Sequence, residues 1–135
     1  MINHSQMKTF THKFFLLFLL GMTVGTLTFG YDKEDLERLR KTQKCLGCDL
    51  SYADLSYTHL TGANLTGADL EGVNLFRANL SLANLTGANL TVAHLEETNL
   101  TGAMLTDAKL SFSIMTKAIL CNTVMPDGQR IVKDC

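Results

Sequence analysis

The sequence predicts an all-β solenoid, a chain that turns a corner every five residues and stacks one coil on the next. The first observation is a leucine at every fifth position from Leu50 to Leu110, with leucine or methionine continuing in phase to position 125. The second is a small residue, usually alanine, two positions before each of them, as in Ala63-Asn64-Leu65. These positions define sixteen five-residue units. A short internal repeat of this kind is typical of a repeat architecture.

The period of five excludes both regular alternatives. In an α-helix every fifth residue advances by about 140° net, so the leucines would spiral around the whole surface. In a flat strand the side chains alternate with a period of two, so successive leucines would point to opposite faces. The chain must therefore turn once per unit, with the leucine and the small residue before it facing inward. The result is a packed column without a lumen.

A four-residue β-turn such as Leu65-Thr66-Gly67-Ala68 can supply each corner. Glycine occupies the third position of several corners, where a type II turn requires a positive φ. Other units carry Tyr57, Arg77, Leu82 or Glu97 at this position. We expect those units to form type I or irregular corners, so that the column has two kinds of corner.

Residues 1–30 differ from the rest of the chain because they contain no acidic residue. Lys8 and Lys13 precede the apolar run Phe14–Met22, and small residues follow it, which is the layout of a secretory signal with cleavage after Gly30. The alternative is an uncleaved anchor, but this run is short against the roughly 20 residues of a membrane span. The sequence therefore predicts a bacterial protein that is exported, periplasmic or secreted, with no stable membrane span after cleavage.

Residues 31–47 are expected to form an N-terminal capping helix. Asp32 suits the N-cap position, and Asp35 three residues later completes a capping-box pattern. Leu36 and Leu39 are one helical step apart, while basic residues crowd the C-terminal half, as the helix dipole favours. We expect a short amphipathic helix of about three turns that covers the end of the solenoid.

The tandem A-[DN]-L pattern over residues 48–125 resembles the pentapeptide repeat family. It is carried by units such as Ala53-Asp54-Leu55, Ala68-Asp69-Leu70 and Ala88-Asn89-Leu90, and the flanks KCLGCDLSYADL and CNTVMPDGQ resemble those of exported members. The resemblance implies a right-handed quadrilateral β-helix with four units per coil. Sixteen units would then form about four coils, in a column about 19 Å long at the usual strand spacing.

Four units per coil imply that residues twenty positions apart stack on one another. One inward column would be Leu50, Leu70, Leu90 and Leu110. An outward column of alternating charge would be Arg77, Glu97 and Lys117. Opposite charges at strand spacing attract each other modestly, and salt screens that attraction.

The last units lose the Asn/Asp position, where Met104, Lys109, Ile114, Ile119 and Val124 stand instead. The final coil is thus apolar outside as well as inside. The simpler interpretation is that the C-terminal tail, residues 126–135, folds back over it. The alternative is that the final coil associates with a second copy, which would give a homodimer through the C-terminal coil.

The four cysteines indicate disulfides in an exported chain, with three possible connectivities. In the column implied by the resemblance, Cys45 and Cys48 lie at the opposite end from Cys121 and Cys135, too far for a cross-bond. We expect Cys121 to pair with Cys135 and clip the tail, and Cys45–Cys48 to be a local bridge or free thiols. A redox site is less favoured because the Cys-x-x-Cys pair follows the helix in sequence, and a four-cysteine zinc site fails on the same distance.

No catalytic, cofactor-binding or metal-binding set is visible in the sequence. His59 and His94 fall at outward positions on different sides and have no partner at ligand spacing. The net charge of −1 argues against a nucleic-acid partner, which would require a basic stripe. The leading hypothesis is therefore a non-enzymatic exported module with a structural role or a protein partner of unknown identity.

Two alternative functions come from other classes. The resemblance includes DNA-mimicking inhibitors of DNA topoisomerase, but residues 48–125 carry only seven acidic against three basic side chains, and export would remove the target. An ice-binding array could form from Thr66, Thr86 and Thr106 stacked in one column. Such a column also arises from the repeat alone, so both alternatives rank below the interaction module.

Overall fold

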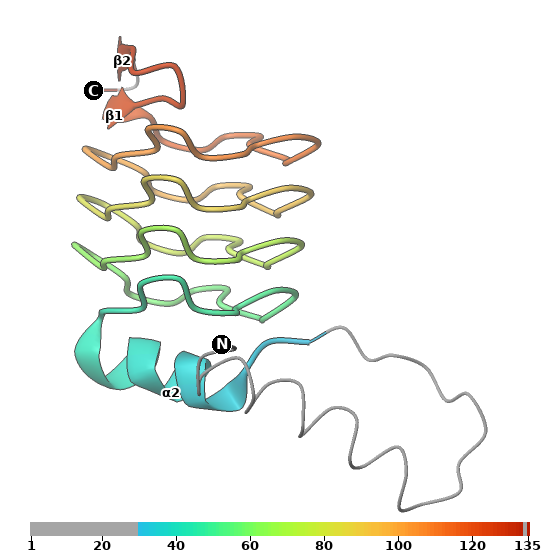
Figure 1. Cartoon of the computed structure of the whole chain (residues 1–135). Helices are drawn as coiled ribbons and strands as arrows, with labels where there is room; N and C mark the ends of the chain where they lie inside the picture. Colours follow the sequence, from blue (N-terminus) through green and yellow to red (C-terminus); the bar gives the residue numbers. More distant parts are fainter. Residues whose placement is uncertain (1–29, 134) are drawn as a thin grey trace, which may run out of the picture.

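The computed structural model describes residues 30–133 and Cys135, so the signal predicted for residues 1–30 lies outside the described residues except for Gly30. Coils stack into a column between helix α2 (Lys33–Thr42) at one end and strands β1 (Cys121–Val124) and β2 (Arg130–Val132) at the other (Figure 1). Within this part of the chain, no helix combines the length and the apolar character needed to cross a membrane.

Residues twenty positions apart pair along the whole column. The bridges run from Lys44 with Asn64 to Met104 with Val124, all in parallel orientation. Each joint is closed by backbone hydrogen bonds such as that from the Leu85 amide to the Met104 carbonyl, at 2.7 Å. This register confirms that four units complete one coil.

The core is a continuous stack of inward leucines and the small residues beside them. Leucines from 50 to 105 are almost fully buried, and each contributes roughly 2 kcal/mol through burial of apolar surface. Threonine replaces alanine at Thr98 and Thr123, whose buried hydroxyls donate to the carbonyls of Leu75 and Leu100 at 2.7 Å. A polar residue is therefore tolerated inside the column only where its hydroxyl is satisfied.

The prediction of two kinds of corner is wrong. Tyr57, Arg77, Leu82 and Glu97 adopt φ between 55° and 60°, close to the 65° of Gly67. A side chain in this left-handed region is disfavoured in isolation. The amides at these four positions donate to the next coil, and that pairing favours the same backbone conformation as at the glycine corners. Glycine is thus a preference of the corner rather than a requirement.

The outward Asn/Asp position stabilises the corner that follows it. The side-chain oxygen of Asn84 accepts from the Thr86 amide at 3.0 Å, and that of Asp54 accepts from the Ser56 amide at 3.0 Å. These bonds satisfy a corner amide that has no partner in the neighbouring coil. Units that carry Met104 or Ile114 at this position cannot form the bond.

At the N-terminal end, the helix is shorter and the repeat begins earlier than the predicted boundary at residues 47 and 48. Helix α2 ends at Thr42, and Lys44 already pairs with the next coil. Cys45 occupies the inward leucine position of this extra unit, and Gln43 occupies its alanine position. The unit escaped notice in the sequence because glutamine and cysteine replace both of its marker residues.

Helix α2 confirms the predicted N-cap, but not the capping box. The Asp32 carboxylate accepts from the amides of Glu34 at 2.7 Å and Asp35 at 3.3 Å. The Asp35 carboxylate instead accepts from the amide of Asp49 in the first coil, at 2.9 Å. Leu36 and Leu39 are buried against the column, as expected for a cap. The second acid therefore fastens the helix to the solenoid rather than to its own N-terminus.

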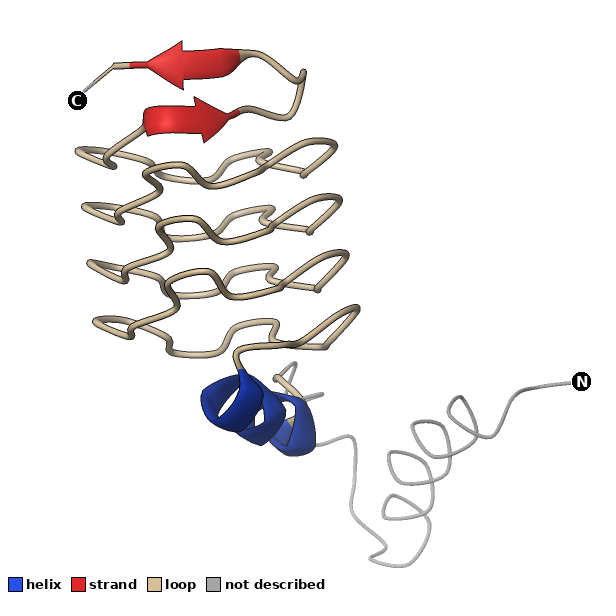
Figure 2. Ribbon diagram, turned by 90° about the vertical axis from the view of Figure 1, so that its left-hand side faces the viewer, coloured by secondary structure: helices blue, strands red, loops and turns tan. Residues whose placement is uncertain are grey.

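At the C-terminal end, the tail folds back but covers only one side of the final coil. Strand β2 pairs antiparallel with β1, with a bulge between Cys121 and Thr123, and lies over the last coil in Figure 2. Away from this hairpin, Phe112, Ile114 and Ile119 remain 86%, 43% and 40% exposed. The expectation that the tail would cover the apolar final coil is thus met on one side only.

Candidate functional site

The four sides of the column differ in the side chains that they present, because residues twenty apart share a side. The side built from units 53–57, 73–77, 93–97 and 113–117 combines contacting aromatic rings with charges of both signs. We use the name aromatic-acidic face for six of its outward residues: Tyr57, Phe76, Arg77, His94, Glu96 and Glu97.

An aromatic pair lies on one half of this face. The rings of Tyr57 and Phe76 meet edge to face, with centroids 5.5 Å apart and planes at 87°. The guanidinium carbon of Arg77 lies 5.1 Å from the centroid of the Phe76 ring. Edge-to-face and cation–π contacts of this kind are both favourable. The Phe76 ring is therefore held in place although it stands on the outer surface of the column.

Arg77 and Glu97 form an ion pair one coil apart, as the predicted charge column requires. The Arg77 Nε atom lies 2.6 Å from Glu97 Oε2. This hydrogen bond is the main reason that the pKa of Glu97 lies below its ordinary value, and the charge of Lys117 lowers it slightly further. Among the described residues, Lys117 forms no ion pair with Glu97. The alternating column thus exists as one close pair and one more distant cation.

Glu96 has no comparable cation. Its polar neighbour is instead His94, whose Nδ1 lies 3.5 Å from Glu96 Oε1. Glu96 Oε2 is buried and, within the described chain, accepts no hydrogen bond. An unpaired buried polar atom typically costs about 1–3 kcal/mol. Glu96 and His94 line an open hollow of about 400 Å³, together with Asn74 and Phe76.

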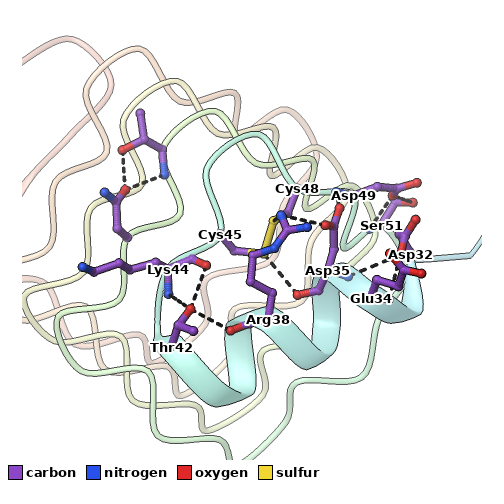
Figure 3. Close-up of a disulfide and its surroundings, with 12 residues drawn as sticks. Asp32, Glu34, Asp35, Arg38, Thr42, Lys44, Cys45, Cys48, Asp49 and Ser51 are labelled. Carbon is purple, nitrogen blue, oxygen red and sulfur yellow. Dashed lines mark hydrogen bonds and ion pairs between the residues drawn. A yellow bond between two sulfur atoms is a disulfide. The ribbon is translucent and has the colours of Figure 1, made fainter. Parts of the chain in front are cut away.

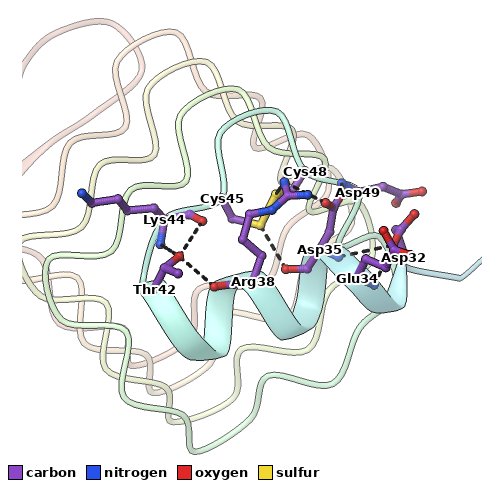
Figure 4. A network of polar contacts seen from close by, with 9 residues as sticks. All are labelled: Asp32, Glu34, Asp35, Arg38, Thr42, Lys44, Cys45, Cys48 and Asp49. Atoms are coloured by element: carbon purple, nitrogen blue, oxygen red, sulfur yellow. Dashed lines mark hydrogen bonds and ion pairs between the residues drawn. A yellow bond between two sulfur atoms is a disulfide. The ribbon is translucent and has the colours of Figure 1, made fainter. Parts of the chain in front are cut away.

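A second polar cluster joins α2 to the first coil and surrounds a disulfide (Figure 3). Cys45 and Cys48 are bonded to each other, and both are buried. The Arg38 guanidinium lies 3.0 Å from the Asp35 carboxylate and 3.5 Å from the Cys48 sulfur. Figure 4 shows Asp35 between Arg38 and Asp49, where it links the helix to the coil.

This cluster contains the residue types of a metal or redox site, but their arrangement indicates a role in holding the structure together. Ligand atoms of Asp35, Cys45 and Cys48 lie within 4.8 Å of one another. Both sulfurs are used by the disulfide, and the Arg38 guanidinium lies beside them and would repel a cation. The disulfide spans one corner, over the four residues that a backbone hydrogen bond closes in later units. The disulfide therefore closes the turn under the helix covalently, in place of the backbone hydrogen bond.

The second disulfide joins Cys121 of β1 to Cys135, fourteen residues later. It closes the loop that contains β2, so the returning tail is fixed to the coil that it covers. Arg130 adds a hydrogen bond to the Asn122 carbonyl, at 3.0 Å. Cys121–Cys135 is the pairing expected from the sequence, and Cys45–Cys48 adopts the local bridge, one of the two alternatives that the sequence left open.

The remaining candidate residues are dispersed. His59 is exposed on a different side from His94, and the structure brings no other histidine near it among the described residues. In the threonine column, the Thr66 hydroxyl donates to Asn64 Oδ1 at 2.7 Å. One of the three hydroxyls in this column is thus engaged within its own unit, so the column is not a uniform array of outward hydroxyls.

Sequence reasoning missed the hollow beside Phe76. It requires Asn74 over His94 and Phe76 over Glu96, two pairs of residues that are twenty apart. The predicted register already contained this information. The sequence feature that predicts the hollow is the pair Phe76 and Glu96, an aromatic and an acidic residue twenty positions apart. Each of them directly follows an inward leucine.

The protein is a β-solenoid that carries the aromatic-acidic face on one outer side and one disulfide at each end. The chain belongs to the pentapeptide repeats family, whose profile matches residues 44–81 and 83–122, more than half of the sequence. Members of this family form right-handed quadrilateral β-helices, in agreement with the register described above.

Two solved structures illustrate the similarity. A pentapeptide repeat protein from the Arabidopsis thaliana thylakoid lumen is 27% identical, with a TM-score of 0.57, over 59% of this chain and 56% of that protein. HetL, a pentapeptide repeat protein involved in heterocyst differentiation regulation in the cyanobacterium Nostoc sp. strain PCC 7120, is 30% identical. That match has a TM-score of 0.37 and covers 65% of this chain and 51% of HetL.

The chain thus spans little more than half the length of either protein. No curated protein matches the sequence significantly. The comparisons establish the family and the fold, and the function must be argued from the surface of this chain.

Proposed function

We propose that the chain is an exported, non-enzymatic pentapeptide-repeat β-helix that acts as a protein-interaction module. The observation that carries the proposal is the aromatic-acidic face. Exposed aromatic and arginine side chains are enriched in protein interfaces. Here Tyr57, Phe76 and Arg77 support one another on a rigid scaffold, although the column itself does not need them for its core.

Export is supported by two independent features. The first 30 residues have the layout of a secretory signal, and the structure contains two disulfides, which persist in oxidising compartments. The similar Arabidopsis protein is located in the thylakoid lumen, a compartment that proteins reach by crossing a membrane. A periplasmic or secreted location of this chain is consistent with these features.

Photo-crosslinking tests the interaction function directly. A benzoylphenylalanine residue at position 57, expressed in the native host, should form a discrete adduct that mass spectrometry identifies as one protein. The additional substitution Phe76→Ala should abolish that adduct, because it removes the ring that Tyr57 contacts.

The matched control places the same photo-reactive residue at position 52. Tyr52 is also an exposed corner tyrosine, but it lies on the neighbouring side of the column. Equal adducts from positions 52 and 57, or none from position 57, would contradict an interaction centred on the aromatic-acidic face.

A homodimer through the C-terminal coil is a second candidate partner relationship. The amides of Leu110, Phe112 and Met115 have no backbone partner within the described chain, and apolar side chains surround them. An open backbone edge beside apolar side chains is a template for pairing with another chain. A second copy would supply the same open edge and the same apolar surface.

Sedimentation equilibrium tests this association. The mature protein should show a concentration-dependent dimer, and Ile119→Lys should shift it to the monomer. Leu82→Lys is the matched control because Leu82 is an exposed apolar residue in the middle of the column. A parent protein that stays monomeric at high concentration would exclude the homodimer.

A further inference from the structure

The two neighbouring carboxylates of the aromatic-acidic face differ in how their charge is balanced. Glu97 receives the Arg77 side chain at 2.6 Å. Glu96 has only His94 at 3.5 Å, and its second oxygen accepts no hydrogen bond from the described residues. One negative charge is therefore left without a cation of its own beside an aromatic ring.

The ring next to Glu96 already carries a guanidinium. Arg77 lies over the Phe76 ring at 5.1 Å from its centroid, so this environment accommodates an arginine head group. Phe76 is only partly buried and also lines the hollow that contains Glu96. A planar guanidinium suits such a place because it can pack on an aromatic ring and donate to a carboxylate at the same time.

The groups around the hollow are fixed before any partner arrives. Asn74 pairs through its backbone with His94 in the next coil. Its side chain donates to Asp54 Oδ1 at 3.2 Å and accepts from the Phe76 amide at 3.1 Å. A preorganised site loses little conformational entropy on binding.

We propose that this hollow receives an arginine side chain of the protein partner, with its guanidinium donating to Glu96 beside Phe76. The inference rests on the proposed interaction function and specifies the chemistry of the partner. The charge of the repeats agrees with it, because residues 48–125 carry seven acidic and three basic side chains. A basic partner surface complements this face, and opposite charge favours the encounter.

An NMR titration of the mature protein tests the site without knowledge of the partner. N-acetyl-argininamide at millimolar concentration should shift the amide signals of residues 74–76 and 94–96. N-acetyl-citrullinamide has nearly the same shape without the charge, and it should leave them unchanged. Equal shifts with both compounds, or none with argininamide, would overturn the inference.

Glu96→Gln should weaken argininamide binding by about tenfold, since it removes the charge that the guanidinium meets. Glu71→Gln is the matched control: Glu71 also follows an inward leucine directly, but on the neighbouring side of the column. Binding that weakens equally in both variants would show a general response to charge and would also overturn the site.

The proposed function and this inference can fail separately. If position 57 crosslinks a partner and Glu96→Gln does not reduce the adduct, the arginine site is wrong while the interaction module stands. If argininamide binds with the stated selectivity and no crosslink forms, the hollow recognises guanidinium but the partner proposal is wrong.

Discussion

The two ends of the column are closed in different ways. At the N-terminal end, α2 buries Leu36 and Leu39 against the first coil, and Leu50 is fully buried beside them. At the C-terminal end, the β1–β2 hairpin covers one side. Leu110 and Met115 stand in the inward columns of Leu50 and Leu55, yet they are only partly buried. One end is sealed and the other is partly open.

The backbone shows the same contrast. Amides inside the column, such as that of Leu90, donate to the coil that follows, whereas the amides of Leu110 and Met115 find no backbone partner in the described residues. Each coil buries its inward side chains against the coils on either side of it. The first and last coils lack one of these neighbours, and the repeat itself provides nothing to cover them. Repeat proteins therefore depend on terminal segments that break the repeat. Here α2 fulfils this role more completely than the tail does.

The largest loss of stability is expected in the middle of the column, and the losses at the two ends can be compared with it. Leu85→Asp places an unpaired carboxylate in a coil that is packed on both sides, and we expect it to cost more than about 4 kcal/mol and unfold the column cooperatively. Asn84→Asp is the control, since aspartate retains the oxygen that accepts from Thr86. Circular dichroism melts that show equal losses for both variants would contradict the assigned inward face.

The comparison of the ends is tested by one substitution made at each of them. Leu50→Ala should cost about 3 kcal/mol because it leaves a cavity under the helix. Leu110→Ala should cost about 1 kcal/mol, because the partly exposed site removes less apolar surface from water. Urea denaturation measures both values. A cost at Leu110 as large as that at Leu50 would mean that the C-terminal end is covered in solution, as the homodimer would require.

The two disulfides sharpen the comparison further. Mass spectrometry of the non-reduced protein should find Cys121 joined to Cys135 and Cys45 joined to Cys48. Replacing both Cys121 and Cys135 by serine should cost roughly 2–3 kcal/mol, because the bridge closes a loop of about fifteen residues. Hydrogen exchange should then rise in β2 and stay unchanged in α2.

The corresponding change at Cys45 and Cys48 should have the opposite pattern, with faster exchange in α2 and an unchanged β2. A cross-link between Cys45 and Cys121 would contradict the separation of the two ends. Equal exchange in both elements after either change would mean that the ends open together.

The smallest effect is expected from the Arg77–Glu97 pair, which is exposed and lies away from both ends. Glu97→Lys would align three cations and should lower the melting temperature slightly, with a loss that shrinks in high salt. The pKa of Glu97 is lowered in the folded state, so its contribution is present above the unfolded pKa and disappears as the pH falls through the folded value. A melting temperature equal to that of the parent at low ionic strength would show that the pair contributes nothing.

The period of five predicted the repeat and the inward leucines, because it occurs many times, whereas the register of twenty residues was implied by the resemblance to the family. The sequence did not predict the corners at Tyr57 and Arg77 correctly, since pairing between coils outweighs the local preference against a positive φ. The first unit was hidden because Gln43 and Cys45 replace both of its marker residues.

The candidate site was less predictable than the fold. The outward position of His94 followed from the register, but its hollow depends on which residues lie in the adjacent coil. The extent of the C-terminal cover also escaped prediction. It depends on how far the short tail after Pro126 extends over the last coil. The tail is not part of the repeat, so the five-residue period does not predict its path.

The constant separation of twenty residues has a consequence for how such chains can change length in evolution. Removing or inserting one whole coil, such as residues 65–84, leaves every remaining pair in register and keeps each outer side aligned. Removing a single unit of five residues also preserves the inward leucines, but it rotates everything downstream by one side of the square. The core would tolerate both events, whereas a surface built across coils, such as Asn74 with His94, survives only the first. Selection for a binding face would therefore favour length changes in steps of twenty.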